Sequence, residues 1–172
     1  MNLQSDDFDL FGLPRSFAQD RAAIDAAWKA LQSQAHPDKF AAEGAAAQRL
    51  AMQWSVRINE AYQRLKDPIR RAAYLCELAG FPIAAHQNTA MPAAFLMRQM
   101  EWHEALEDAD SADALDGLAE QVRDEQAGML AQCQQQIDVA HDYPGAVQTV
   151  RALMFVDKFG QDVRARQHAL DA

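Results

Sequence analysis

The chain has 172 residues, 49% of them hydrophobic and 24% charged, which is the composition of a soluble folded protein of one or two domains. No run approaches the ~18 apolar residues that a membrane-spanning helix needs, and the acidic amino terminus resembles neither a secretory signal nor a transit peptide, so we expect a cytoplasmic protein. Residues 1–74 hold ten Lys/Arg and nine Asp/Glu, whereas residues 75–172 hold six Lys/Arg and sixteen Asp/Glu. The acidic second half argues against nucleic acid as a partner, and the unequal charge suggests two surfaces for different partners.

The first predicted elements form a helical hairpin. Asp20 is the expected N-cap of a helix over Arg21 to Ala35, in which apolar residues recur every three or four positions. A second helix from near Ala45 to Lys66 has a matching apolar side. The residues of the two stripes are Ile24, Ala27, Trp28, Leu31 and Ala35, and Ala51, Trp54, Ile58, Ala61, Tyr62 and Leu65. With Phe8, Leu10 and Phe11 of a short preceding segment, they predict a small three-helix unit.

A short helix over 68–79 begins with a proline and ends before Gly80. Residues 80–91, GFPIAAHQNTAM, have the composition of a linker. Beyond it, three long helical patterns cover about 92–109, 112–141 and 144–169 and predict an antiparallel bundle. We therefore expect an all-α protein with a first unit over 1–79, a linker over 80–91 and an acidic three-helix unit over 92–172.

The polar residues that often hold metals show no metal-site pattern. Cys76 and Cys133 lie far apart in the sequence, which predicts neither a disulfide framework nor a metal knuckle, and we expect both to be small core residues. The five histidines show no spacing typical of a zinc site. We expect no metal and no cofactor.

Between the first two helices the chain reads QAHPDKF, and we call His36, Pro37 and Asp38 the HPD loop. An HPD sequence between an amphipathic helix and a second helix ending in INEAYQRLKDP resembles the J-domain of DnaJ-type co-chaperones. The stretches HPDKF, RINEAYQRLKDPIRRAAYL and AFLMRQMEWHEAL resemble the HscB-type branch of iron–sulfur cluster assembly, and this resemblance covers nearly the whole chain. It implies that the HPD loop activates ATP hydrolysis in a DnaK-class chaperone of the HscA type.

The chemistry of the HPD loop fits recognition and not catalysis. Pro37 fixes the backbone, Asp38 offers a carboxylate for bidentate contact with a partner arginine, and His36 presents a polar ring at a helix end. A nucleophile beside the histidine and a glycine-rich phosphate loop are both missing, so we expect no enzyme. The competing interpretation is a solvated turn between two helices.

Two departures from the J-domain pattern concern the surroundings of this loop. The residue before HPD is commonly aromatic but is Ala35 here, so we expect another residue, Phe40, to support the loop. Few basic residues are available to face an acidic chaperone. The expected chaperone contacts are Arg21, Lys29 and Lys39 beside the HPD loop, with Arg15, Arg70 and Arg71 as further candidates.

The helix that follows Pro92 has two apolar sides. Phe95, Gln99, Trp102 and Leu106 gather on one side, a sufficient core stripe. A second set lies about 100° to 240° from Phe95 and forms an apolar patch bordered by carboxylates: Leu96, Met97, Met100, Glu101, Glu104 and Asp108. Either these residues fill the bundle or they bind a partner, for which methionine is well suited.

The resemblance implies that this second face, together with Phe155, binds an IscU-type scaffold protein. Phe155 lies about 140° from Val150 and off the apolar stripe of its helix, which agrees with an outward role, although bundle packing is the alternative. The sequence thus predicts a co-chaperone that brings the scaffold to the chaperone. A J-domain adaptor that delivers a different client, and a plain helical adaptor in which HPD is accidental, remain open.

Overall fold

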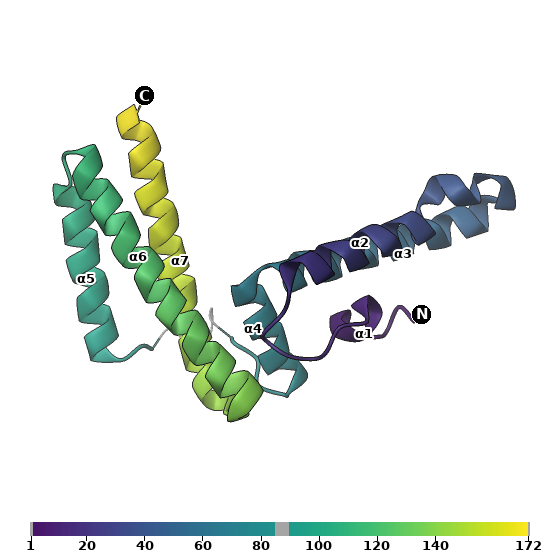
Figure 1. Ribbon diagram of the computed structural model, residues 1–172, viewed down its shortest axis with the longest axis horizontal. Coiled ribbons are helices and arrows are strands. Elements are labelled where there is room, and N and C mark those ends of the chain that lie inside the picture. The colour runs from purple at the N-terminus through teal and green to yellow at the C-terminus, as the bar shows by residue number, and fades with distance from the viewer. Residues whose placement is uncertain (1, 85–89, 172) are drawn as a thin grey trace. The chain divides into compact units, whose positions relative to one another are not determined.

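The computed structural model describes residues 2–84 and 90–171, and within these ranges the chain is helical without any strand (Figure 1). It divides into two compact units, Met1–Leu75 and Cys76–Ala172, and the division falls inside helix α4 (Pro68–Leu78). The expected linker, 80–91, includes residues 85–89, which lie outside the described residues. In the described part of the chain no helix is both long and apolar enough to cross a membrane.

The first unit is built on an antiparallel hairpin of α2 (Arg21–Ala35) and α3 (Ala45–Lys66), whose bounds confirm the predicted helices. The side chain of Asp20 accepts a hydrogen bond from the N–H of Ala22 at 3.0 Å, as expected of an N-cap. The two helices bury the predicted stripes against each other and against α1 (Asp7–Phe11). The buried residues are Phe8, Leu10, Phe11, Ile24, Leu31, Ala35, Ala51, Ile58, Ala61 and Leu65.

A buried carboxylate fixes α1. Asp7 is fully buried, and Arg64 donates two hydrogen bonds to it, at 2.6 Å from Nε and 2.9 Å from Nη2. Nη1 of Arg57 lies 2.8 Å from the same carboxylate as a second ion pair. Both arginines belong to α3, so one acidic side chain ties the short first helix to the hairpin.

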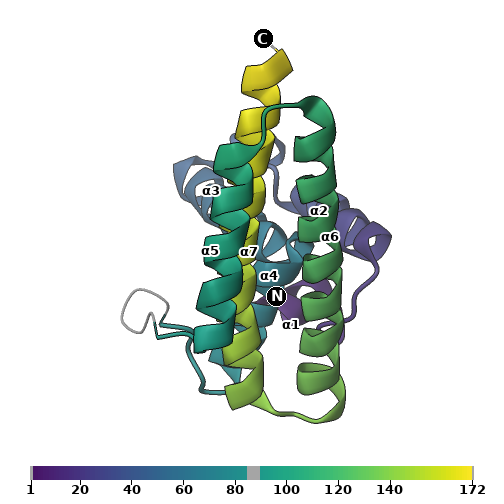
Figure 2. The ribbon, with the colours of Figure 1, turned by 90° about the vertical axis from the view of Figure 1, so that its left-hand side faces the viewer.

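The second unit contains α5 (Ala93–Asp108), α6 (Ala112–Gln134), a π-helical turn η2 (Gln135–Val139) and α7 (Tyr143–Asp171). Figure 2 shows α5, α6 and α7 side by side, and all three pairs are in contact. Their core consists of Trp102, Leu118, Val122, Val156, Phe159 and Val163. The predicted helix 112–141 is interrupted by η2, whereas the other two long helices lie within a few residues of their expected bounds.

Candidate functional site

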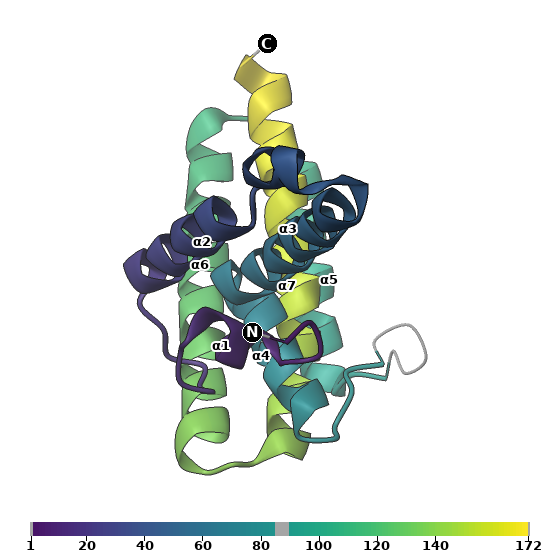
Figure 3. The ribbon, with the colours of Figure 1, turned by 90° about the vertical axis from the view of Figure 1, so that its right-hand side faces the viewer.

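The HPD loop lies at the tip of the hairpin, where α2 ends (Figure 3). Because Pro37 disfavours helical backbone in the residue before it, His36 adopts an extended conformation (φ −62°, ψ 127°) and ends α2. Its carbonyl accepts from the N–H of Lys39 at 3.0 Å, and its Nδ1 accepts from the N–H of Asp38 at 3.2 Å. The conformation of the loop is thus held by two hydrogen bonds that backbone N–H groups donate to His36.

Both polar side chains of the HPD loop face solvent. The side chain of Asp38 is 92% exposed and that of His36 is 55% exposed, with Oδ2 of Asp38 3.6 Å from Nδ1 of His36. An Nδ1 atom that accepts a backbone hydrogen leaves the proton of the neutral ring on Nε2, which can then donate outward. The loop therefore offers a partner one ring N–H and one carboxylate on a fixed backbone.

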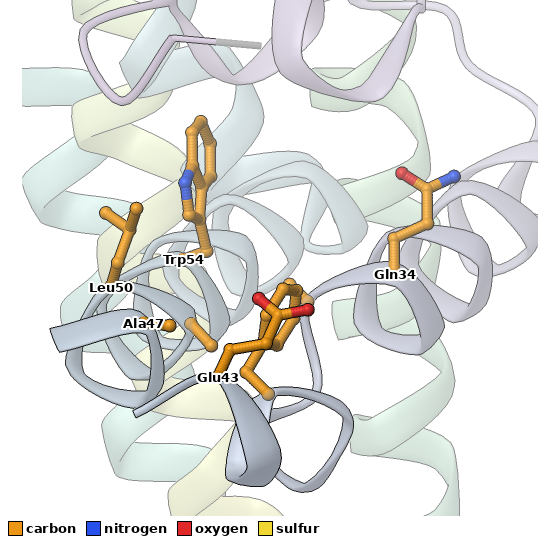
Figure 4. A pocket seen from close by; sticks show the side chains of 8 residues that line it. Gln34, Glu43, Ala47, Leu50 and Trp54 are labelled. Carbon is orange, nitrogen blue, oxygen red and sulfur yellow. The ribbon is translucent and has the colours of Figure 1, made fainter. Parts of the chain in front are cut away.

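Pro37 and Asp38 of the loop already belong to a 3-10 helix, η1 (Pro37–Glu43), which the sequence did not predict. Together with the ends of α2 and α3 it encloses an apolar cavity of about 290 Å³, here named the tip pocket. In Figure 4, Ala47, Leu50 and Trp54 reach from α3, and Gln34 lies opposite on α2. The lining residues are Gln34, Ala35, Phe40, Glu43, Ala47, Leu50, Ala51 and Trp54. Phe40, the residue expected to support the loop, lines this pocket together with Ala35, and its support of the loop stays a prediction.

The three basic residues expected to contact the chaperone, Arg21 at the far end of α2, Lys29 and Lys39, differ in whether they have a partner within the chain. Arg21 donates to Asp25 at 2.9 Å, and this hydrogen bond raises the pKa of Arg21 and lowers that of Asp25. Lys29 is exposed, and Lys39 is exposed beside the hydroxyl of Ser33 at 3.4 Å.

The further basic candidates for a chaperone contact, Arg15, Arg70 and Arg71, differ in their burial and in their partners. The expectation that Arg71 could face a chaperone is wrong, because Arg71 is buried and donates to the carbonyls of Phe17 and Leu65. Arg15 pairs with Asp6, whereas Arg70 is exposed.

The second candidate surface lies on α5, whose two sides separate as predicted. Phe95, Gln99, Trp102 and Leu106 face the bundle. Leu96, Met97 and Met100, which we call the methionine patch, are 47%, 63% and 64% exposed, so the alternative in which they fill the bundle is wrong. The three carboxylates beside them, the acidic rim, are also exposed: Glu101, Glu104 and Asp108.

Phe155 of α7 has a mixed environment. It is 42% exposed, yet its ring packs edge-on against Phe95 with centroids 6.1 Å apart. Since Phe95 is the neighbour of Leu96 on α5, this contact places Phe155 beside the start of the methionine patch. Phe155 therefore packs against the bundle through Phe95 and remains partly exposed, so its role in binding a partner stays a prediction.

Sequence reasoning missed two features of these surfaces. The tip pocket is lined by Leu50 and Trp54 of α3 together with the small Ala35 at the end of α2, and Leu50 was not part of the predicted stripe. Gln99 is 9% exposed, in agreement with its predicted place on the core stripe, but its side-chain nitrogen has no hydrogen-bond partner in the described residues, which the pattern did not indicate. A glutamine on a core stripe is the signal that could have pointed to it.

Comparison with known proteins connects the chain to one family throughout its length. A family model described as the HSCB C-terminal oligomerisation domain matches residues 91–164. The co-chaperone protein HscB homolog of Burkholderia mallei is 49% identical over 174 aligned residues, which cover 99% of both chains.

Two solved structures agree with this similarity. The chaperone HscB from Vibrio cholerae is 36% identical with a TM-score of 0.87, covering 96% of this chain and 99% of its own. The human co-chaperone protein HscB, at 24% identity and a TM-score of 0.91, covers 96% of this chain and 83% of its own and shares the fold.

Proposed function

Because the chain belongs to the HscB family of co-chaperones, we propose that it stimulates the ATPase of a DnaK-class chaperone of the HscA type and delivers an IscU-type iron–sulfur scaffold protein to it in the cytoplasm. The observation that carries the proposal is the exposed HPD loop, whose two polar side chains are held outward on a backbone fixed by proline and two hydrogen bonds. The chain itself would act as a binding protein and not as an enzyme.

The HPD loop would engage the chaperone through directed polar contacts. The Asp38 carboxylate suits a bidentate contact with an arginine, and the Nε2 hydrogen of His36 suits a carbonyl or carboxylate acceptor. Lys39 directly follows the loop and Lys29 lies on α2, and both would act as weaker electrostatic elements, whereas Arg21 lies at the opposite end of α2 and would contribute only at long range. Since the loop is already ordered, docking costs little conformational entropy, which supports a role as a rigid plug.

The methionine patch and its acidic rim, with Phe155, would hold the scaffold. Full burial of a methionine side chain contributes about 1.5–3 kcal/mol, so covering the exposed two-thirds of Met97 and Met100 would contribute about 1–2 kcal/mol each. The carboxylates at the edge would favour a partner whose apolar surface is flanked by basic groups.

Joining the two surfaces in one chain gives the mechanism. The scaffold bound to the second unit is carried to the chaperone bound by the first, so two pairwise encounters replace a three-body collision and the local scaffold concentration rises. Stimulated ATP hydrolysis then retains the scaffold on the chaperone and promotes cluster maturation and transfer.

An ATPase assay with the purified chaperone tests the first surface. His36→Gln should abolish stimulation without changing the melting temperature, because the His36 side chain is exposed and accepts one solvent-accessible hydrogen bond. His168→Gln, the same change at an exposed position of the second unit, should stimulate as the wild type does. Undiminished stimulation by His36→Gln would refute the chaperone role.

Calorimetric titration with the scaffold tests the second surface. Met100 and Val139 are both 64% exposed, so Met100→Lys and Val139→Lys are matched substitutions. Met100→Lys should weaken scaffold binding about tenfold or more, while Val139→Lys should not, and both should retain basal ATPase stimulation.

Two other outcomes of the same experiments have specific meanings. A wild-type chain that stimulates the chaperone but does not bind the scaffold would be an adaptor for a different client. Since the matching family model is described as an oligomerisation domain, sedimentation of both variants also shows whether the methionine patch binds a second copy of the chain.

A further inference from the structure

The tip pocket lies directly behind the HPD loop. Ala35 precedes His36 and Phe40 follows Lys39, so the residues on both sides of the loop line the same cavity. Its lining is mainly apolar, with Leu50 and Trp54 contributed by α3 (Figure 4). The pocket and the HPD loop therefore share the same end of the hairpin.

Size and chemistry limit what the pocket can take. Small-molecule sites usually measure about 300–1,000 Å³, and an apolar cavity of about 150 Å³ holds a single benzene ring. The 290 Å³ tip pocket therefore suits one large aliphatic or aromatic side chain. Gln34 and Glu43 are its polar lining residues and both are exposed, whereas the other six lining residues are apolar, which favours an apolar occupant.

We propose that the tip pocket receives an apolar side chain of the chaperone when the HPD loop docks, which rests on the chaperone-binding function proposed above. The small side chain of Ala35 leaves the space open on the α2 side. Leu50 is 51% exposed at the opposite wall and would become covered on docking. The pocket adds an apolar anchor to a contact that otherwise consists of polar groups and exposed charges.

Filling the pocket from α3 provides the test, because α3 leaves the HPD loop unchanged. Ala47 lines the pocket, whereas its neighbour Ala46 is exposed outside it, so Ala47→Leu and Ala46→Leu are matched. Ala47→Leu should raise about tenfold the concentration of the variant that is needed for half-maximal stimulation of the chaperone's ATPase. Ala46→Leu should change this concentration less than about twofold. Neither should alter scaffold binding.

The outcomes separate this proposal from the one on which it rests. If the wild type stimulates the chaperone and Ala47→Leu does so equally well, the tip pocket is an internal packing gap and the inference fails. If the wild type does not stimulate, the proposed function itself fails.

A second measurement covers the case in which Ala47→Leu loses stability. The wild-type chain is labelled with 5-fluorotryptophan, and the ¹⁹F signal of Trp54, assigned with Trp54→Phe, is followed as unlabelled chaperone is added. Trp54 lines the pocket and its signal should shift, while that of Trp102 in the second unit should not. An unmoved Trp54 signal under conditions of full stimulation would overturn the inference.

Discussion

Replacing Asp7 by asparagine should destabilise the first unit by about 3 kcal/mol. Asp7 is fully buried, and its carboxylate is paired with Arg57 at 2.8 Å and with Arg64 at 2.6 Å. Its backbone N–H also donates to the hydroxyl of Tyr74 in α4 at 3.0 Å. The residue thus connects three helices, and hydrogen bonding to its carboxylate raises the pKa of Arg64.

The size of this destabilisation follows from the two arginine charges that remain when the Asp7 carboxylate is removed. Removing one partner of a buried ion pair costs about 3–5 kcal/mol, because the remaining charge loses its compensation. Asparagine keeps the shape of Asp7 and can accept a hydrogen bond, but it neutralises neither guanidinium. The side chains of Arg57 and Arg64 are 16% and 34% exposed, so water relieves part of the penalty and the lower end of the range applies.

The assay is urea unfolding followed by tryptophan emission. In a Trp102→Phe background the remaining tryptophans, Trp28 and Trp54, both report on the first unit. Asp9→Asn is the matched control, since Asp9 lies on the same helix but is exposed, and it should change stability by less than about 0.5 kcal/mol. Equal effects of Asp7→Asn and Asp9→Asn would refute the idea that buried charge holds α1.

Two further predictions concern the second unit. Gln99→Met should raise the free energy of unfolding by about 1 kcal/mol, because it removes a buried amide nitrogen without a described partner. Melting monitored by Trp102 emission checks this against the exposed control Gln121→Met. A destabilised Gln99→Met would contradict the prediction. Burial raises the pKa of the Cys76 thiol to about 11 and that of Cys133 to about 12, from 9.0, so both should react with a disulfide reagent at pH 8 only at the unfolding rate. Because the unfolded thiols ionise at lower pH than the folded ones, their contribution to stability is complete below pH 9 and is lost as the pH rises toward 11 to 12. Urea titrations across this range can measure the loss. Labelling of the thiols that is faster than unfolding would contradict their burial.

The helical framework could be predicted because its signals are local. The bounds of α2 and α3 follow from Asp20 at one end, prolines at the others and an apolar repeat between them. The two sides of α5 follow from angular position alone, and the exposure of Met97 and Met100 agrees with that arithmetic. The helical period was therefore enough to predict which side chains of α5 are exposed.

The features that were missed depend on contacts between distant residues. Arg71 looks like a surface cation in sequence, yet its donors satisfy the carbonyls of Phe17 and Leu65 in the interior. The 3-10 turn over Pro37–Glu43 and the π-helical turn over Gln135–Val139 have no period of their own that a sequence pattern could reveal. The tip pocket likewise exists only once α2, η1 and α3 are placed together.

Internal pairing changes how the first unit can attract its partner. Of its basic residues, Arg15, Arg21, Arg57 and Arg64 form ion pairs with carboxylates of the same unit, and Arg71 is buried. The basic side chains without an ion pair among the described residues are Lys29, Lys39, Arg49, Lys66 and Arg70. Paired cations contribute little to long-range steering, so if the proposed chaperone presents an acidic surface, its approach would gain less from charge than the number of Lys and Arg suggests. Under the proposed function, affinity would depend more on short-range contacts at the hairpin tip, where the HPD loop and the tip pocket lie next to each other.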